Sequence, residues 1–154
     1  MSLRDRAQRV AALEGREWRA LADGVLAAVR IEWGLRTRPL STVILWAESR
    51  PARPSDDEVD GPRLFALSAW PYRAVGVSPS CLRRSLVLTA LLRQRRRPAV
   101  ICVGVLKHGD GLRAHAWVEC GATAFDTGTE RFERFDRLPP SAAARLTRSV
   151  RWLP

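Results

Sequence analysis

The chain has 154 residues, of which 46% are hydrophobic and 27% charged, a size and balance typical of a single globular domain. Its formal net charge is +10, yet lysine occurs only at Lys107 and arginine is dispersed from Arg4 to Arg151. A nucleic-acid footprint would be clustered on one face, so the charge argues against nucleic acid and favours an acidic partner only weakly. No apolar run could span a bilayer, the first residues lack the apolar core of a signal peptide, and three cysteines form no disulfide framework. We therefore expect a cytoplasmic protein with reduced thiols and no membrane partner.

The N-terminal part is predicted to be helical. Apolar residues recur at helical spacing over residues 3–34, with an interruption at Gly15. Residues 40–48 are expected to form a second short helix, with a strand as the alternative. Residues 49–62 gather Pro, Ser, Asp and Gly, which predicts a loop.

This loop is the best candidate boundary in the chain. We expect a helical N-terminal subdomain over 1–50, a linker over 51–62 and a second domain over 63–154. The linker carries a run of acidic residues, interpreted as a solvated loop or as a contact for the arginine-rich N-terminal helix. The run consists of Asp56, Asp57, Glu58 and Asp60.

The second domain is predicted to contain helices first and strands afterwards. The expected elements are a helix over 63–73 stopped by Pro71, a helix over 79–94, strands over 99–106, 113–119 and 122–127, and a final helix over 139–147. A helix followed by an antiparallel meander is an α+β arrangement.

Cys81 lies in the first turn of the predicted helix over 79–94. Ser78 or Ser80 can cap this helix, and Pro79 suits its start. The unpaired N–H groups and the positive end of the helix dipole favour the thiolate, the reactive form of cysteine. Cys81 is therefore a candidate nucleophile, and a buried packing residue is the alternative.

A nucleophilic cysteine needs a base, and the sequence offers His108, in a predicted exposed turn, and His115, in an alternating strand. A hairpin turn at Cys120-Gly121 would bring a carboxylate beside His115, because opposed residues share a face with Cβ atoms roughly 4.5–5.5 Å apart. The pairs expected about this turn are Glu119–Ala122, Trp117–Ala124 and His115–Asp126. Such a histidine and aspartate, with a cysteine, would form a catalytic triad. If Asp126 points away, Glu119 and Asp136 are the carboxylates to consider.

Other interpretations are weaker. A zinc site would have to use Cys81, Cys120 and His115, none of which have short ligand spacing, so no metal is expected. Cys102 and Cys120 are interpreted as structural or incidental. The arginines at 93 and 95–97 are interpreted as a helix end, where cations complement the helix dipole. A second interpretation is that they also help to dock an acidic partner.

Three motifs follow in order: "CLRRSLVLTALLR", the strand "VICVGV", and "HAWVE" with a following Asp. Together they resemble the transglutaminase-like cysteine proteases of lasso-peptide biosynthesis, the B2 leader peptidases. The resemblance covers about residues 63–128. One departure is Pro98, where the family often has glycine, and it affects a loop only.

The resemblance implies a papain/transglutaminase-like α+β fold, in which a nucleophile helix packs on an antiparallel sheet. It implies that Cys81 is the nucleophile, His115 the general base and Asp126 the orienting carboxylate, without a cofactor. The substrate would be a ribosomally made precursor peptide whose leader is removed. The partners would be a small leader-recognition protein (the B1 protein) and the ATP-dependent lasso cyclase.

Four further side chains are candidates for substrate binding: Trp70, Tyr72, Arg84 and Trp117. For Trp117, a plain core aromatic is the alternative. Two other functions also stay open at this point. One is a binding module that positions a peptide without cleaving it, and the other is transfer of the acyl group to an amine, as transglutaminases do.

Overall fold

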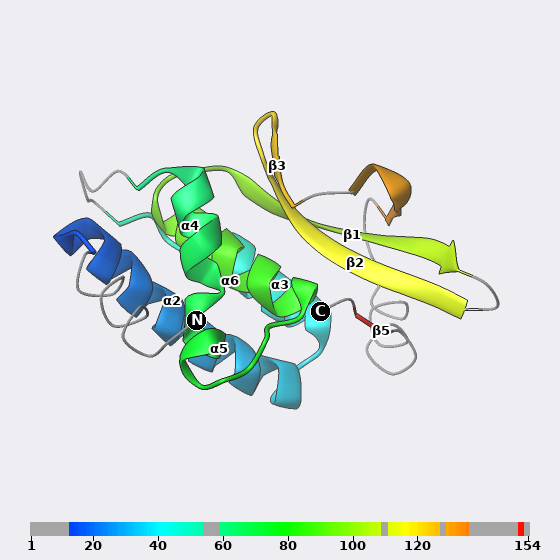
Figure 1. Ribbon diagram of the computed structural model, residues 1–154, viewed down its shortest axis with the longest axis horizontal. Helices are drawn as coiled ribbons and strands as arrows, with labels where there is room; N and C mark the ends of the chain where they lie inside the picture. The colour runs from blue at the N-terminus through cyan, green and yellow to red at the C-terminus, as the bar shows by residue number, and fades with distance from the viewer. Residues whose placement is uncertain (1–12, 54–58, 109–110, 127–128, 136–150, 153–154) are drawn as a thin grey trace.

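The computed structural model describes residues 13–53, 59–108, 111–126, 129–135 and 151–152 (Figure 1). Its helices are α2 (Gly15–Thr37), α3 (Leu40–Glu48), α4 (Gly61–Ser68), α5 (Trp70–Ala74) and α6 (Cys81–Gln94). Its strands are β1 (Ala99–His108), β2 (Gly111–Cys120), β3 (Thr123–Phe125), β4 (Glu133–Phe135) and β5 (Arg151–Trp152), and a 3-10 turn, η1, covers Thr129–Arg131. The predicted α+β class is confirmed.

The N-terminal part is helical, as predicted, over the residues that the structure describes. Helix α3 has the predicted bounds, and α2 starts at Gly15, where an interruption was expected. Glu14 and Glu17 form a capping box at this start, since the Glu14 N–H donates to Glu17 Oε2 at 2.9 Å. The start of the predicted first helix and the whole of the final helix over 139–147 lie outside the described residues.

The prediction of one helix over 63–73 stopped by Pro71 is wrong. The segment forms two helices, α4 and α5, which meet at Ala69, and Pro71 lies in the first turn of α5. Proline has no N–H to donate, and a first-turn N–H has no partner within the helix, so Pro71 starts a helix at no cost.

Helix α6 is the centre of the molecule. The Ser80 hydroxyl caps it by accepting the Arg83 N–H at 3.5 Å, and nearly all of its residues from Cys81 to Gln94 are buried. Helices α2, α3 and α4 and strands β1 and β2 all pack against it, and it lies in the middle of the molecule in Figure 1. The predicted N-terminal subdomain therefore shares one hydrophobic core with the rest of the described chain.

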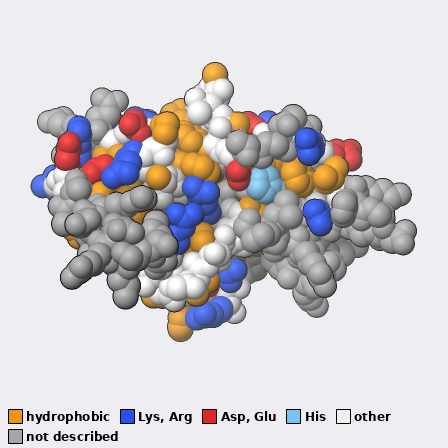
Figure 2. Space-filling model, in the orientation of Figure 1, with side chains coloured by type: hydrophobic (Ala, Val, Ile, Leu, Met, Phe, Trp, Pro, Cys, Tyr) orange, Lys and Arg blue, Asp and Glu red, His pale blue; other side chains and the backbone are white. Residues whose placement is uncertain are grey.

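The arginines at the end of α6 and directly after it donate hydrogen bonds to nearby carbonyl groups. Arg95 donates to the Leu91 carbonyl at 3.0 Å and Arg93 donates to the Ala99 carbonyl at 2.8 Å. Arg96 has a φ of 59°, the left-handed conformation that often closes a helix. On the face shown in Figure 2, the Lys and Arg side chains lie in several separate patches.

The sheet has the order β3-β2-β1-β4, and β5 pairs with β2 in parallel. One face of β1 and β2 joins the core with α6, through residues such as Val103, Ala116 and Val118. Because side chains alternate along a strand, the opposite face carries His115 and Trp117.

The predicted hairpin register is wrong by one residue at the turn. Strand β3 pairs with β2 through Glu119–Ala124 and Cys120–Thr123, so the two-residue loop is Gly121-Ala122 rather than Cys120-Gly121. Gly121 supplies the positive φ, 60°, that such a turn requires. Moving a turn by one residue shifts each pairing by two positions, which preserves the face of every side chain. Asp126, just after Phe125, is therefore not directly opposite His115 in the ladder.

One hydrogen bond joins α6 to β2. The Ser85 hydroxyl, 6% exposed as a residue, donates to the Ala116 carbonyl at 3.0 Å. Strand β2 pairs with β3 at 118–120 and with β5 at 113–114, and Ala116 lies between these two segments. The bond thus ties the helix to the residue that follows His115.

We expect Ser85→Ala to lower the free energy of unfolding by about 1–3 kcal/mol, because it leaves a buried carbonyl without its donor. Thr89, one turn further along α6, is a matched control, since its buried hydroxyl has no hydrogen-bond partner among the described residues. Thr89→Val should therefore be neutral or stabilising in urea titrations followed by circular dichroism. Equal losses in the two variants would contradict the importance of the Ser85 bond.

Candidate active site

His115 and Asp126 meet in the structure. His115 Nε2 lies 3.2 Å from Asp126 Oδ2, within ion-pair distance, although the angle departs from that of a hydrogen bond. The His115 residue is only 7% exposed. Its other ring nitrogen, Nδ1, is buried and has no hydrogen-bond partner among the described residues. The carboxylate thus approaches one nitrogen and leaves the other to act on a second group.

The backbone at Asp126 is unusual. Its φ of 154° lies in a region that residues with a side chain rarely adopt. Such conformations cost of order 1–3 kcal/mol, and they persist only where the surrounding structure holds them. They cluster at active sites, so this strain is a second and independent indication that Asp126 has a functional role.

Two aromatic rings enclose the His115 imidazole. The Trp117 ring is nearly parallel to it, with centroids 6.1 Å apart, and the Phe132 ring centroid lies at 5.0 Å. Gly104, paired with His115 across the sheet, makes room for them, since a Cβ there would lie 2.8 Å from Phe132 Cβ. The sequence analysis did not identify Phe132, but a glycine inside the apolar run 99–106 was a readable signal of a close approach.

Glu119 is engaged with other partners. Trp117 Nε1 donates to Glu119 Oε1 at 3.0 Å, and Arg134 Nη1 lies 3.0 Å from Oε2. The hydrogen bond from Trp117 lowers the pKa of Glu119, and Arg134 adds to this effect. Glu119 therefore orients Trp117, and Asp136, the other reserve carboxylate, lies outside the described residues.

Cys81 lies in the first turn of α6, as predicted, although the helix begins at Cys81 itself rather than at residue 79, and the residue is 6% exposed. It therefore lies at the positive end of the helix dipole, beside the Ser80 cap. Ser85, one turn later on the same face of the helix, holds the Ala116 carbonyl next to His115. The N-terminal turns of α6 and the His115 segment of β2 are thus fastened to each other.

Arg84, another candidate for substrate binding, lies near Asp126 of the His115–Asp126 pair. Its guanidinium lies 3.4 Å above the Phe65 ring centroid and donates from Nη2 to the Phe65 carbonyl at 3.0 Å. Burial lowers the pKa of Arg84, Asp126 opposes this shift, and Arg73 reinforces it. Asp126 is thus close enough to Arg84 to attract its charge.

Trp117 lies beside His115, and the two remaining candidates, Trp70 and Tyr72, have other contacts. Tyr72 is buried beside Glu32 of α2, and burial followed by the Glu32 charge raises its pKa. Glu32 also pairs with Arg83 at 2.6 Å. Trp70, at the start of α5, packs against the hydrophobic core. Roles for Trp70 and Tyr72 in substrate binding stay predictions.

The family model of the transglutaminase-like superfamily matches residues 25–139. The chain belongs to the transglutaminase-like superfamily. This superfamily includes cysteine proteases and acyltransferases, and the matched range contains Cys81, His115 and Asp126. The comparisons with curated proteins and with solved structures returned no match.

The described residues of this transglutaminase-like domain hold no group of three His, Cys, Asp or Glu side chains arranged to bind a metal ion. None of the described helices is long and apolar enough to cross a membrane.

Alkylation of the cysteines by iodoacetamide tests whether Cys81 is activated. Cys102 is an internal control, because it is also buried and because burial raises its pKa to about 11, which keeps it a thiol at neutral pH. We expect Cys81 to react at least about tenfold faster than Cys102, because the thiolate is the form of cysteine that iodoacetamide alkylates. His115→Ala should remove most of this difference. Similar rates at Cys81 and Cys102 in the wild type, read by peptide mass spectrometry, would contradict activation.

Proposed function

We propose that this transglutaminase-like chain is a cysteine peptidase that removes the leader from a ribosomally made lasso-peptide precursor. The observation that carries the proposal is the contact of 3.2 Å between the buried His115 Nε2 and Asp126 Oδ2. His115 lies on a strand that is hydrogen-bonded to the helix beginning at Cys81. The choice of a lasso precursor comes from the sequence resemblance.

The proposed reaction has two steps. The Cys81 thiolate attacks the scissile carbonyl carbon, and a carbon–sulfur bond forms. The carbon–nitrogen bond then breaks as His115 gives a proton to the leaving amine, and a thioester remains. In the second step His115 takes a proton from water, which attacks the thioester and releases the carboxylate product and Cys81.

The surroundings fit these roles. Asp126 would orient the ring and stabilise the imidazolium that forms during each step. The backbone N–H of Cys81, at the start of α6, would donate to the developing oxyanion. The Trp117 and Phe132 rings would exclude water from the imidazole and strengthen its pairing with Asp126.

The proposal includes two partners. A leader-recognition protein of the B1 kind would deliver the precursor, and the ATP-dependent cyclase would receive the released core peptide. The net charge of +10 is compatible with an acidic leader or partner. No cofactor is needed for either step.

Transfer of the acyl group to an amine is the second candidate, because the superfamily also includes acyltransferases. It shares the thioester and differs only in the acceptor. The mass of the product separates the two, since a transferred amine adds its own mass to the released acyl group.

We expect the wild-type chain, with its recognition protein, to cut the precursor at one site in a mass-spectrometric assay. Cys81→Ala should abolish cutting because no thioester can form. Asp126→Asn should slow cutting by about 10²–10⁴-fold through loss of ring orientation.

Cys120→Ala is the control, since this cysteine lies at the end of β2 and should be dispensable. If Cys81→Ala cuts as well as the wild type, or if the wild type cuts nothing, the proposed function is wrong.

A further inference from the structure

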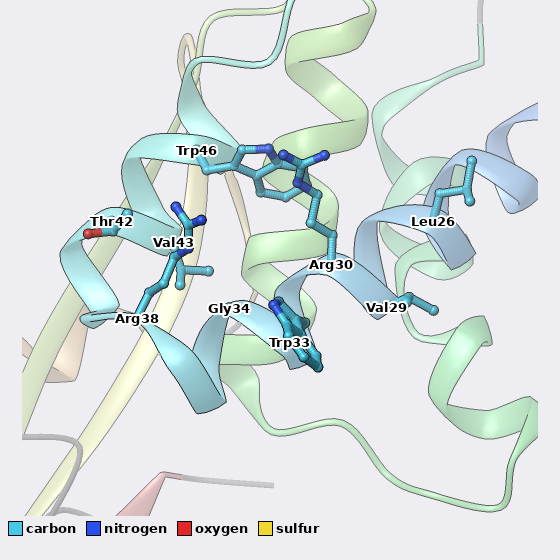
Figure 3. Close-up of a pocket in the computed structure, with 9 residues that line it drawn as sticks. All are labelled: Leu26, Val29, Arg30, Trp33, Gly34, Arg38, Thr42, Val43 and Trp46. Carbon is cyan, nitrogen blue, oxygen red and sulfur yellow. The ribbon is translucent and has the colours of Figure 1, made fainter.

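A groove lies between α2 and α3, on elements separate from the His115 strand (Figure 3). Its volume is about 640 Å³. Its apolar lining residues come from both helices: Leu26, Val29 and Trp33 of α2, and Val43 and Trp46 of α3. Gly34 and Val43 close its floor, where a Cβ on Gly34 would lie 3.1 Å from Val43 Cγ2.

The α2 wall of the groove is apolar yet open to solvent. Leu26, Val29 and Trp33 are 65%, 66% and 67% exposed, and their spacing places them on one stripe of the helix. The opposite stripe of α2 faces α6 with small residues such as Ala27 and Ala28. A stripe of large apolar side chains left open beside a groove is typical of an interaction site.

Arginines surround the groove. Arg30 and Arg38 line it, and Figure 3 shows Arg30 reaching from α2 toward Trp46. The guanidinium carbons of Arg30 and Arg50 lie 5.3 and 5.0 Å from the centre of the Trp46 ring. Burial lowers the pKa of Arg50, and repulsion from Arg53 and Arg30 lowers it further, while the Asp23 carboxylate opposes the shift. None of the lining residues is acidic, so an incoming carboxylate would relieve this repulsion.

The charge of the groove selects among possible occupants. A second copy of the chain would bring one arginine rim against another, at a net charge of +10 on each molecule. Residues 1–12 and 136–150 each carry three arginines and one aspartate, so they are also repelled. Residues 54–58 are acidic but lack a large apolar side chain to fill the groove.

We propose that this groove binds an acidic amphipathic helix of a partner protein. The apolar side chains of that helix enter beside Val29, Trp33 and Trp46, and its carboxylates meet Arg30 and Arg38. This helix-in-groove binding uses anchors at successive turns of the partner. The inference does not depend on the proposed peptidase reaction, so either can fail while the other stands.

Two synthetic helical peptides of equal length test the proposal on the full chain. Both carry leucines at i, i+3 and i+7, and their flanking positions are glutamate in one and lysine in the other. We expect fluorescence anisotropy to show binding of the glutamate peptide that weakens with added salt, and at least about tenfold weaker binding of the lysine peptide.

Variants at the groove locate the binding. Val29→Glu should weaken binding of the glutamate peptide by at least about tenfold, because it puts a carboxylate among the apolar anchors. Leu45→Glu is the matched control, since Leu45 is 65% exposed on α3 but does not line the groove. It should change binding by less than about twofold. Arg38→Glu, at an exposed position, should reduce the preference for the glutamate peptide over the lysine peptide. This second variant keeps the test valid if Val29→Glu fails to fold.

Four results would overturn the proposal. These are no binding of the glutamate peptide, equal binding of both peptides, self-association in sedimentation that Val29→Glu removes, and binding to phosphatidylglycerol vesicles that Val29→Glu removes. The third result would identify a second copy as the occupant, and the fourth a membrane surface.

Discussion

The hydrogen bond from the Ser85 hydroxyl to the Ala116 carbonyl is the constraint on which the candidate site depends. It joins α6 to β2, the two elements that carry Cys81 and His115, between the segments of β2 that pair with β3 and β5. A buried carbonyl at this position would otherwise lack a donor, so the helix cannot slide along the strand without a penalty. The same bond therefore contributes to stability and fixes the start of α6 relative to the strand that carries His115.

The candidate site is a polar pair inside an apolar enclosure. The Trp117 and Phe132 rings flank the His115 imidazole, and Arg84 brings a partly buried positive charge near Asp126. Low polarity strengthens every charge interaction in the enclosure and makes an unpaired charge costly. The Trp117 indole donates a hydrogen bond to the Glu119 carboxylate, and this bond fixes the orientation of the ring beside His115.

Helix α2 packs on α6 along one stripe and lines the groove with α3 along the other. Its buried stripe combines small residues, such as Gly24 and Ala28, with the larger Ile31. The large apolar residues Leu26, Val29 and Trp33 line the groove with α3 instead. Helical periodicity alone makes both stripes candidates for the core, so the sequence pattern could not tell the packed stripe from the open one.

The sequence by itself determined several local features: the bounds of α3, a serine cap that places Cys81 in the first turn of α6, and the strand alternation that led us to expect His115 beside Asp126. These follow from local periodicity and short-range hydrogen bonding. Only the tertiary structure decided the turn at Gly121-Ala122, the start of α5 at Trp70, the contact of Phe132 with His115 and the exposed stripe of α2. The physical reason is that register, ring contacts and the choice of a buried face depend on packing between distant residues, which no local pattern encodes.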